Sequence, residues 1–156
     1  MTMTKMILRT EGDTHIIVTR RFAASQEAVY RAHTDPSIIQ RWLLGPEGWS
    51  MPVCVNDARE GGKIRYEWVN REGAGFHLTA EYITLEPFRR IVHVERMHLP
   101  DPTPDNLVET IFEPDGDGTL MTMRMTLPDA KTRNMMLKTG MEHGMEASYV
   151  RLETII

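Results

Sequence analysis

The chain is poor in the residues and motifs from which many functional sites are built. Its 156 residues include one cysteine, Cys54, so an internal disulfide is excluded and neighbouring thiolates cannot hold zinc. No apolar run exceeds four residues, which is far shorter than a membrane-spanning helix and too short for a signal peptide. We therefore expect a cytoplasmic protein that does not enter a membrane.

The sequence also lacks clusters of like charge, and it lacks motifs that bind nucleotides or metals. The formal net charge is −4 and lysine and arginine form no stripe, so a nucleic-acid partner is not expected. There is no nucleophile elbow, no H-E-x-x-H and no glycine-rich phosphate loop after a strand, and the six histidines contain no i, i+4 pair. The sequence thus predicts neither a metal site nor a cofactor.

Alternating apolar and polar residues dominate the first 127 positions and predict strands. The expected strands span residues 15–22, 49–55, 63–69, 75–85, 90–98, 107–113 and 119–127. The inward faces of the strands over 75–85 and 90–98 stay open, because both of their faces mix polar and apolar residues.

Capping residues mark two short helices after the first strand. Ser25 is a good N-cap for a helix over residues 26–34, and Asp35 followed by Pro36 both ends that helix and starts another, which should end near Leu43. A second Pro-Asp pair, at 128–129, opens a final helical stretch that we expect to continue to Ile156.

The final stretch has glycines where a helix that packs on a sheet normally has large side chains. Its expected inward positions are Leu137, Met141, Met145, Ser148, Leu152 and Ile155. Gly140 and Gly144 lie between them, and each costs about 1 kcal/mol of helix stability relative to alanine. We interpret these glycines as leaving room between the helix and a facing sheet.

These elements together predict an α+β protein with a helix-grip arrangement. A curved antiparallel sheet of about seven strands should wrap around one long C-terminal helix, with two short helices after the first strand. We expect a single domain over residues 13–156, preceded by an N-terminal extension over residues 1–12.

Several short fragments, in this order and spacing, carry a family resemblance. They are Arg20-Arg21-Phe22, Thr34-Asp35-Pro36, Arg41-Trp42, Gly45-Pro46, Arg59-Glu60-Gly61-Gly62, Glu86-Pro87 with Arg90-Ile91-Val92, Thr110 to Glu113, Gly118-Thr119, and Thr139-Gly140-Met141 through Gly144, Ser148 and Leu152. Over residues 14–156 the chain resembles the activator of heat-shock protein 90 ATPase homologue-like family of the START-like superfamily, which also includes birch-pollen-allergen-like proteins and polyketide cyclases. The resemblance implies a helix-grip fold with an internal cavity between the sheet and the last helix, and it makes a homodimer reasonable.

We expect this cavity to bind a small hydrophobic or aromatic ligand of lipid- or polyketide-like chemistry. Twelve methionines are many for this length, and methionine suits adaptable binding surfaces, while tryptophan and tyrosine suit a pocket mouth. The candidate ligand-binding residues are Trp42, Trp49, Met51, Val53, Tyr66, Trp68, Phe112, Met121, Met123, Met125, Met141 and Met145. The loops over residues 44–50 and 99–106 should flank the entrance.

The same residues allow a plain structural interpretation, in which methionines and aromatic rings simply fill the core. Two other functions also stay open. One is a chaperone-associated protein-interaction module, which the family resemblance implies. The other is a cyclase- or hydrolase-like enzyme, in which a buried pair drawn from His77, Glu81, His93 and Glu95 serves as general base. Arg20 is expected to face inward and to pair with Asp57 as a structural ion pair.

Overall fold

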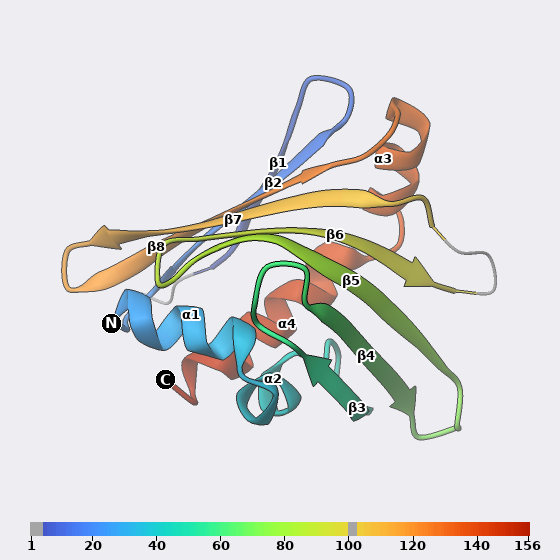
Figure 1. Cartoon of the computed structure of the whole chain (residues 1–156). Coiled ribbons are helices and arrows are strands. Elements are labelled where there is room, and N and C mark those ends of the chain that lie inside the picture. The colour runs from blue at the N-terminus through green and yellow to red at the C-terminus, as the bar shows by residue number, and fades with distance from the viewer. Residues whose placement is uncertain (1–4, 100–102) are drawn as a thin grey trace.

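The computed structural model describes residues 5–99 and 103–156, and its strands form one curved antiparallel sheet (Figure 1). The strands are β1 (Ile7–Glu11), β2 (His15–Phe22), β3 (Trp49–Asn56), β4 (Lys63–Asn70), β5 (Gly75–Glu86), β6 (Arg90–His98), β7 (Asn106–Asp115) and β8 (Gly118–Thr126). Their order in the sheet is β1-β2-β8-β7-β6-β5-β4-β3. The strand beyond the seven expected is β1, which lies within the expected N-terminal extension.

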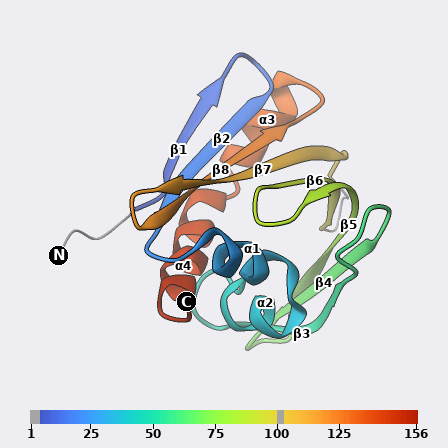
Figure 2. The same cartoon turned by 60° about the vertical axis from the view of Figure 1, so that its left-hand side comes forward.

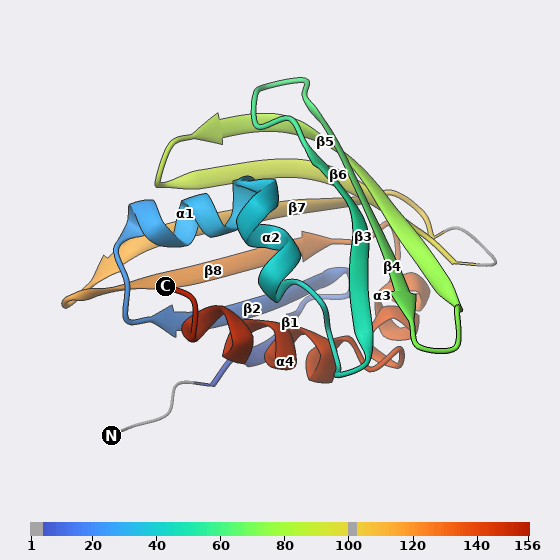
Figure 3. The ribbon, with the colours of Figure 1, turned by 90° about the horizontal axis from the view of Figure 1, so that it is seen from below.

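Four helices complete the described part of the chain: α1 (Gln26–Thr34), α2 (Pro36–Trp42), α3 (Ala130–Leu137) and α4 (Met141–Glu153). Seen from below, α4 crosses the concave side of the sheet beside α1 and α2 (Figure 3), and the turned view shows α3 near the far ends of β2 and β8 (Figure 2). The predicted α+β arrangement, a curved sheet gripping a C-terminal helix, is confirmed.

The helix caps are those that the sequence indicates. Ser25 Oγ accepts a hydrogen bond from Ala28 N at 3.1 Å, and Asp35 Oδ1 accepts one from Ser37 N at 2.9 Å. Asp129 caps α3 by accepting from Thr132 N at 2.7 Å. Each cap satisfies a backbone N–H that has no partner inside its helix.

The expected single C-terminal helix is wrong, because the chain breaks at Gly140. This residue has φ 84°, a left-handed conformation that glycine adopts without a steric cost. A Cβ on Gly140 would meet nothing within 4 Å, and one on Gly144 would lie 3.7 Å from Pro46 Cδ, an ordinary contact. Gly140 therefore separates the two helices, Gly144 lies within α4, and neither glycine is needed to make room under α4.

A bulge in β3 corrects the expected faces of that strand. The register with β4 shifts between Ser50 and Val53, so Val53 lies opposite Glu67 on the convex face. Cys54 and Asn56 face the interior instead, where an unbroken alternation would have placed Val53.

The register that the sequence left open is settled for β5 and β6. His93 lies opposite Tyr82 and Val108 on the concave face. Glu95, two residues further along β6, lies on the same face opposite Ala80. On β5, His77 and Glu81 fall on the convex face, and Glu81 pairs with Lys63 Nζ at 2.9 Å.

Candidate functional site

The concave face holds a hydrogen-bonded His–Glu pair in the middle of the sheet. His93 Nε2 and Glu95 Oε1 are 2.7 Å apart, and both side chains are only 17% and 18% exposed. Since the carboxylate can only accept, Nε2 carries a proton, and in the neutral ring Nδ1 is then an acceptor. Some exposure of two side chains on the inner face of a covered sheet means that space lies beside them.

A second polar group continues the concave face toward β3. Asn56 receives a hydrogen bond from the Tyr82 hydroxyl at 2.8 Å and donates one to the Tyr66 hydroxyl at 2.7 Å. Burial raises the pKa of Tyr82 to about 12, and that of Tyr66 also rises well above its usual value through burial. Both phenols therefore stay protonated, and the Tyr66 hydroxyl retains its own proton for donation.

His33 extends this polar surface from α1. Its Nδ1 lies 2.7 Å from the carbonyl oxygen of Val29, so Nδ1 is protonated and Nε2 is an acceptor. Burial lowers the pKa of His33 to about 4, and a positive charge on His93, when that ring is protonated, lowers it further. The ring packs edge-on against Trp42 and Phe112, with centroids 5.1 and 5.3 Å away, and it stays neutral at physiological pH.

Half-buried methionines from four elements pack against the core. They are Met97 on β6, Met123 on β8, Met136 on α3, and Met141 and Met145 on α4. A side chain with three rotatable bonds can occupy or vacate space at little cost. Met97 and Met136 were not among the sequence candidates, because the register of β6 and the break between α3 and α4 could not be read from the sequence.

The other predicted ligand-binding residues divide by burial. The structure places Trp42, Met51, Tyr66, Trp68, Phe112, Met121 and Met125 in the buried core and leaves Trp49 half-buried. Trp42 anchors α2, since its indole N–H donates to Ala32 O at 2.8 Å and its ring stacks on Tyr149. Phe112 and Met121, at 2% and 0% exposure, have no surface left for a ligand in this conformation.

Arg20 faces inward as expected, but its partners differ from the prediction. Its side chain, fully shielded from solvent, reaches Glu153 Oε1 at 2.8 Å and Glu146 Oε1 at 3.4 Å, both on α4. Asp57 lies at the end of β3 and pairs with Arg59 instead. The guanidinium also lies over the rings of Phe22 and Tyr149. Arg20 thus fastens α4 to β2 and is a structural residue.

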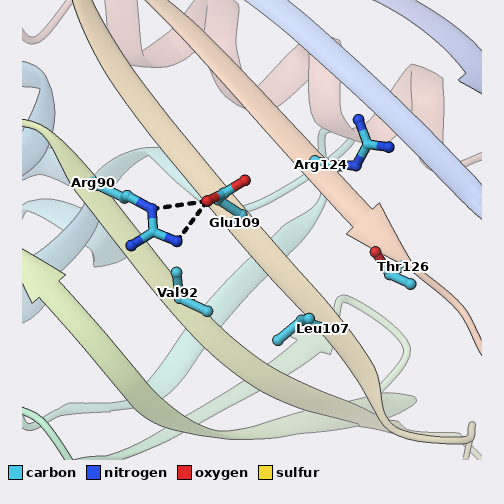
Figure 4. Close-up of a pocket in the computed structure, with 6 residues that line it drawn as sticks. All are labelled: Arg90, Val92, Leu107, Glu109, Arg124 and Thr126. Atoms are coloured by element: carbon cyan, nitrogen blue, oxygen red, sulfur yellow. Dashed lines mark hydrogen bonds and ion pairs between the residues drawn. The ribbon is translucent and has the colours of Figure 1, made fainter.

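A shallow groove of about 240 Å³ lies on the convex face, across β6, β7 and β8 (Figure 4). Arg90 Nε and Nη2 both lie 2.7 Å from Glu109 Oε2, and Arg124 pairs with Glu11 at 2.6 Å. Because both arginines already have carboxylate partners, the groove offers little free charge for an anion. A second hollow, of about 200 Å³, lies beside Trp49 and Arg71 at the end of the β3–β4 pair.

The described part of the chain has neither a cluster of metal ligands nor a membrane-spanning helix. Over residues 5–99 and 103–156 no three His, Cys, Asp or Glu side chains gather in a way that could hold a metal ion. Within the same ranges, no helix has both the length and the apolar character needed to cross a membrane. The expected entrance loop over residues 99–106 lies partly outside the described residues.

Comparison with known proteins identifies the family. The family model described as "Activator of Hsp90 ATPase homolog 1-like protein" matches residues 23–156. The chain belongs to this family. The match begins at the end of β2 and includes all four helices, so the resemblance noted in the sequence is confirmed, and the START-like fold with it.

Several solved structures share the fold over nearly the whole chain. A protein from Rhodobacter sphaeroides is 28% identical with a TM-score of 0.91, and the match covers 97% of each chain. A Mycobacterium smegmatis protein is 18% identical, with a TM-score of 0.85 over 96% of this chain and 95% of that one. An AHSA1-like protein from Aeromonas hydrophila is 20% identical, with a TM-score of 0.75 over 90% and 93%. Among curated proteins, none matches this chain.

Proposed function

We propose that this member of the family binds a small, largely apolar or aromatic molecule between the concave face of the sheet and α3 and α4. The observation that carries the proposal is the partial exposure of His93 and Glu95, 17% and 18%, in the middle of the inner face. Solvent-sized space next to a buried ion-pairing group is costly unless something polar occupies it. The half-buried methionines provide an adaptable apolar wall around that space.

The position of the site fits the way the helices are held. Arg20 and the Tyr149–Trp42 stack secure the second half of α4. The first half of α4 and all of α3 bury no residue completely. We infer that a ligand enters at the α3–α4 end, beside the loop over residues 44–50.

A thermal-shift screen with fatty acids, aromatic polyketides and flavonoids tests the proposal, followed by titration of amide spectra. A ligand present at about 100 times its Kd should stabilise the fold by about 2.7 kcal/mol. The shifted amides should belong to β5, β6, β8, α3 and α4. If no compound shifts the unfolding temperature or those amides, the proposal is wrong.

A pair of variants on β5 provides the matched control. Ala80 lies on the concave face opposite Glu95, and Ile83 on the same strand is 49% exposed. Ala80→Leu should fill space next to Glu95 and weaken binding at least tenfold, whereas Ile83→Leu should leave affinity unchanged. Equal loss in both variants would contradict an interior site.

The 2.7 Å contact between His93 and Glu95 favours one second candidate, an enzyme that abstracts a proton from its bound substrate. A carboxylate that orients a histidine is the usual arrangement of a general base. If turnover of a screened ligand is detected, His93→Gln should lower kcat at least 100-fold, in line with the general-base contribution of about 10²–10⁴. His77→Gln, on the convex face, should leave kcat unchanged, and equal activity of both variants would exclude this mechanism.

A further inference from the structure

Several buried polar atoms of the interior have no hydrogen-bond partner among the described residues. His33 Nε2, His93 Nδ1 and Asn106 Oδ1 are buried polar atoms for which the described residues supply no hydrogen-bond partner. Buried polar atoms are normally paired, so several unpaired ones in one small protein call for an explanation. Asn106 lies directly opposite Glu95 in the β6–β7 register, and His93 lies opposite Val108 two residues further along β7.

In each histidine, one ring nitrogen contacts an oxygen acceptor, and this contact fixes which nitrogen carries the proton of the neutral ring. The Val29 carbonyl can only accept, so it holds the proton of His33 on Nδ1. The Glu95 carboxylate likewise holds the proton of His93 on Nε2. His33, whose depressed pKa keeps the ring neutral, therefore presents a bare lone pair at Nε2, and the neutral form of His93 presents one at Nδ1.

The charges around these atoms indicate the sign of the partner. Glu95 places a carboxylate next to His93, while the buried cation on the concave face, Arg20, already contacts Glu146 and Glu153. An anionic group brought to this place would meet Glu95 and two lone pairs. A neutral group with a hydrogen to donate would satisfy them.

We propose that the interior site selects molecules carrying a hydroxyl group, which donates its proton to His93 Nδ1, with His33 Nε2 as the acceptor for a second hydroxyl. The inference rests on the proposed binding function and specifies the chemistry of the ligand: a hydroxylated aromatic or apolar body. The carboxylate of Glu95 acts as a positioning group, because it fixes which nitrogen of His93 accepts. The methionines contact the apolar body of the ligand.

Matched ligand pairs test this proposal. 2-Naphthol and 2-methoxynaphthalene differ by one methyl group that removes the donor, and isothermal titration or ligand-observed NMR gives the affinity of each. One buried hydrogen bond should favour the naphthol about tenfold. In His93→Phe this preference should fall to about onefold, whereas His77→Phe, on the convex face of β5, should retain it.

A spectroscopic readout covers the case in which His93→Phe fails to fold. Long-range ¹⁵N–¹H spectra of the wild-type protein distinguish the two tautomers of each histidine. They should show His33 protonated on Nδ1 and His93 on Nε2, and adding 2-naphthol should move the bare Nδ1 resonance of His93. 2-Methoxynaphthalene should leave that resonance in place.

The outcomes separate this inference from the function on which it rests. Equal binding of naphthol and ether, or the opposite tautomer at His93, would overturn the hydroxyl inference and leave interior binding intact. Failure of both compounds and of the wider screen to bind would overturn both proposals. A preference for the naphthol that persists in a folded His93→Phe protein would also overturn the assignment of the acceptor.

Discussion

At the scale of single residues, polar side chains on the concave face make two kinds of contact. Arg20 is enclosed and connects two elements far apart in sequence, β2 and α4. His33, His93 and Asn56 keep acceptor or donor capacity directed into the interior. The first kind of contact stabilises the fold, and the second kind leaves hydrogen-bonding groups for a bound molecule.

The contact between Arg20 and Glu153 should contribute measurably to stability. Glu153→Ala removes the shorter of the two carboxylate contacts, 2.8 Å, from a side chain with no solvent exposure. A hydrogen bond to a charged group contributes about 1.5–3 kcal/mol, so we expect a loss of about 2 kcal/mol in the free energy of unfolding by urea denaturation.

The exposed Glu142 on the same helix provides the control for that variant. Glu142→Ala removes only a favourable charge near the helix N-terminus and should cost less than about 1 kcal/mol. Equal losses for the two variants would show that the Arg20 contact contributes no more than a surface charge.

His33 should make stability depend on pH. Its pKa is about 4 in the folded protein and 6.5 in a model peptide. As pH falls from 6.5 to 4, His33 binds a proton in the unfolded chain but stays neutral in the folded one. The free energy of unfolding therefore decreases over this window, by about 3 kcal/mol at about 1.36 kcal/mol per pKa unit. Urea midpoints measured across this range should fall more steeply for the wild type than for His33→Gln.

The exposed His143 gives the comparison for the pH experiment. His143→Gln should follow the wild-type profile between pH 6.5 and 4. If His33→Gln has the same pH profile as wild type, the ring of His33 is not held neutral by burial.

Residue-level prediction from the sequence succeeded where the determinants are local. Ser25 and Asp35 cap their helices through atoms two or three residues away, so the sequence contains the whole interaction. His93 and Glu95 could not be assigned, because a polar strand facing inward has no period that distinguishes its two faces. The signal that was available is the spacing of two between them, which puts both on one face whatever the register.

At the scale of elements, the two glycines differ because Gly140 lies at the break between α3 and α4 and Gly144 lies within α4. Gly140→Ala should destabilise the protein by about 1 kcal/mol, since a left-handed φ costs an L-residue about 1–2 kcal/mol. Gly144→Ala should stabilise it by about 0.5–1 kcal/mol, because the new methyl lies in a helix at ordinary distance from Pro46. Thermal and urea unfolding of both variants measure these changes, and stabilisation by both would indicate one continuous helix.

The elements that the sequence misjudged share one cause. A helix break at a glycine and a bulge in β3 each interrupt a regular repeat, and hydrophobic periodicity does not report where such interruptions fall. The bulge moved Val53 to the convex face and brought Asn56 into the interior, and so it changed the predicted site from purely apolar to partly polar.

At the scale of the whole molecule, the sheet pairs an early strand with the last one. All strand pairs are sequence neighbours except β2 with β8, which brings residues about a hundred positions apart together. The covering helices are held unequally: α4 buries Ser148, Tyr149 and Leu152, while α3 buries no residue. Packing is therefore weakest at the end where α3 meets α4.

Hydrogen exchange should follow this gradient. Amides of β7 and β8 should exchange near the rate set by global unfolding, and those of α3 should exchange at least 100-fold faster, because few buried contacts resist local opening there. Addition of a ligand found in the screen should slow exchange in α3 more than in the second half of α4. Uniform protection of both helices would contradict a flexible entrance.

The three tryptophans all lie on one side of the molecule. Trp42 donates to Ala32 O and Trp68 to Leu43 O, while Trp49 contacts the Phe76 ring, so every indole belongs to α2, β3 or β4 or to their immediate neighbours. Tryptophan fluorescence is consequently sensitive to changes on one side of the protein, and the β1–β2 edge contributes no tryptophan signal. An emission change on adding a compound would report an event near α2, β3 or β4, and an unchanged emission would say nothing of the opposite edge.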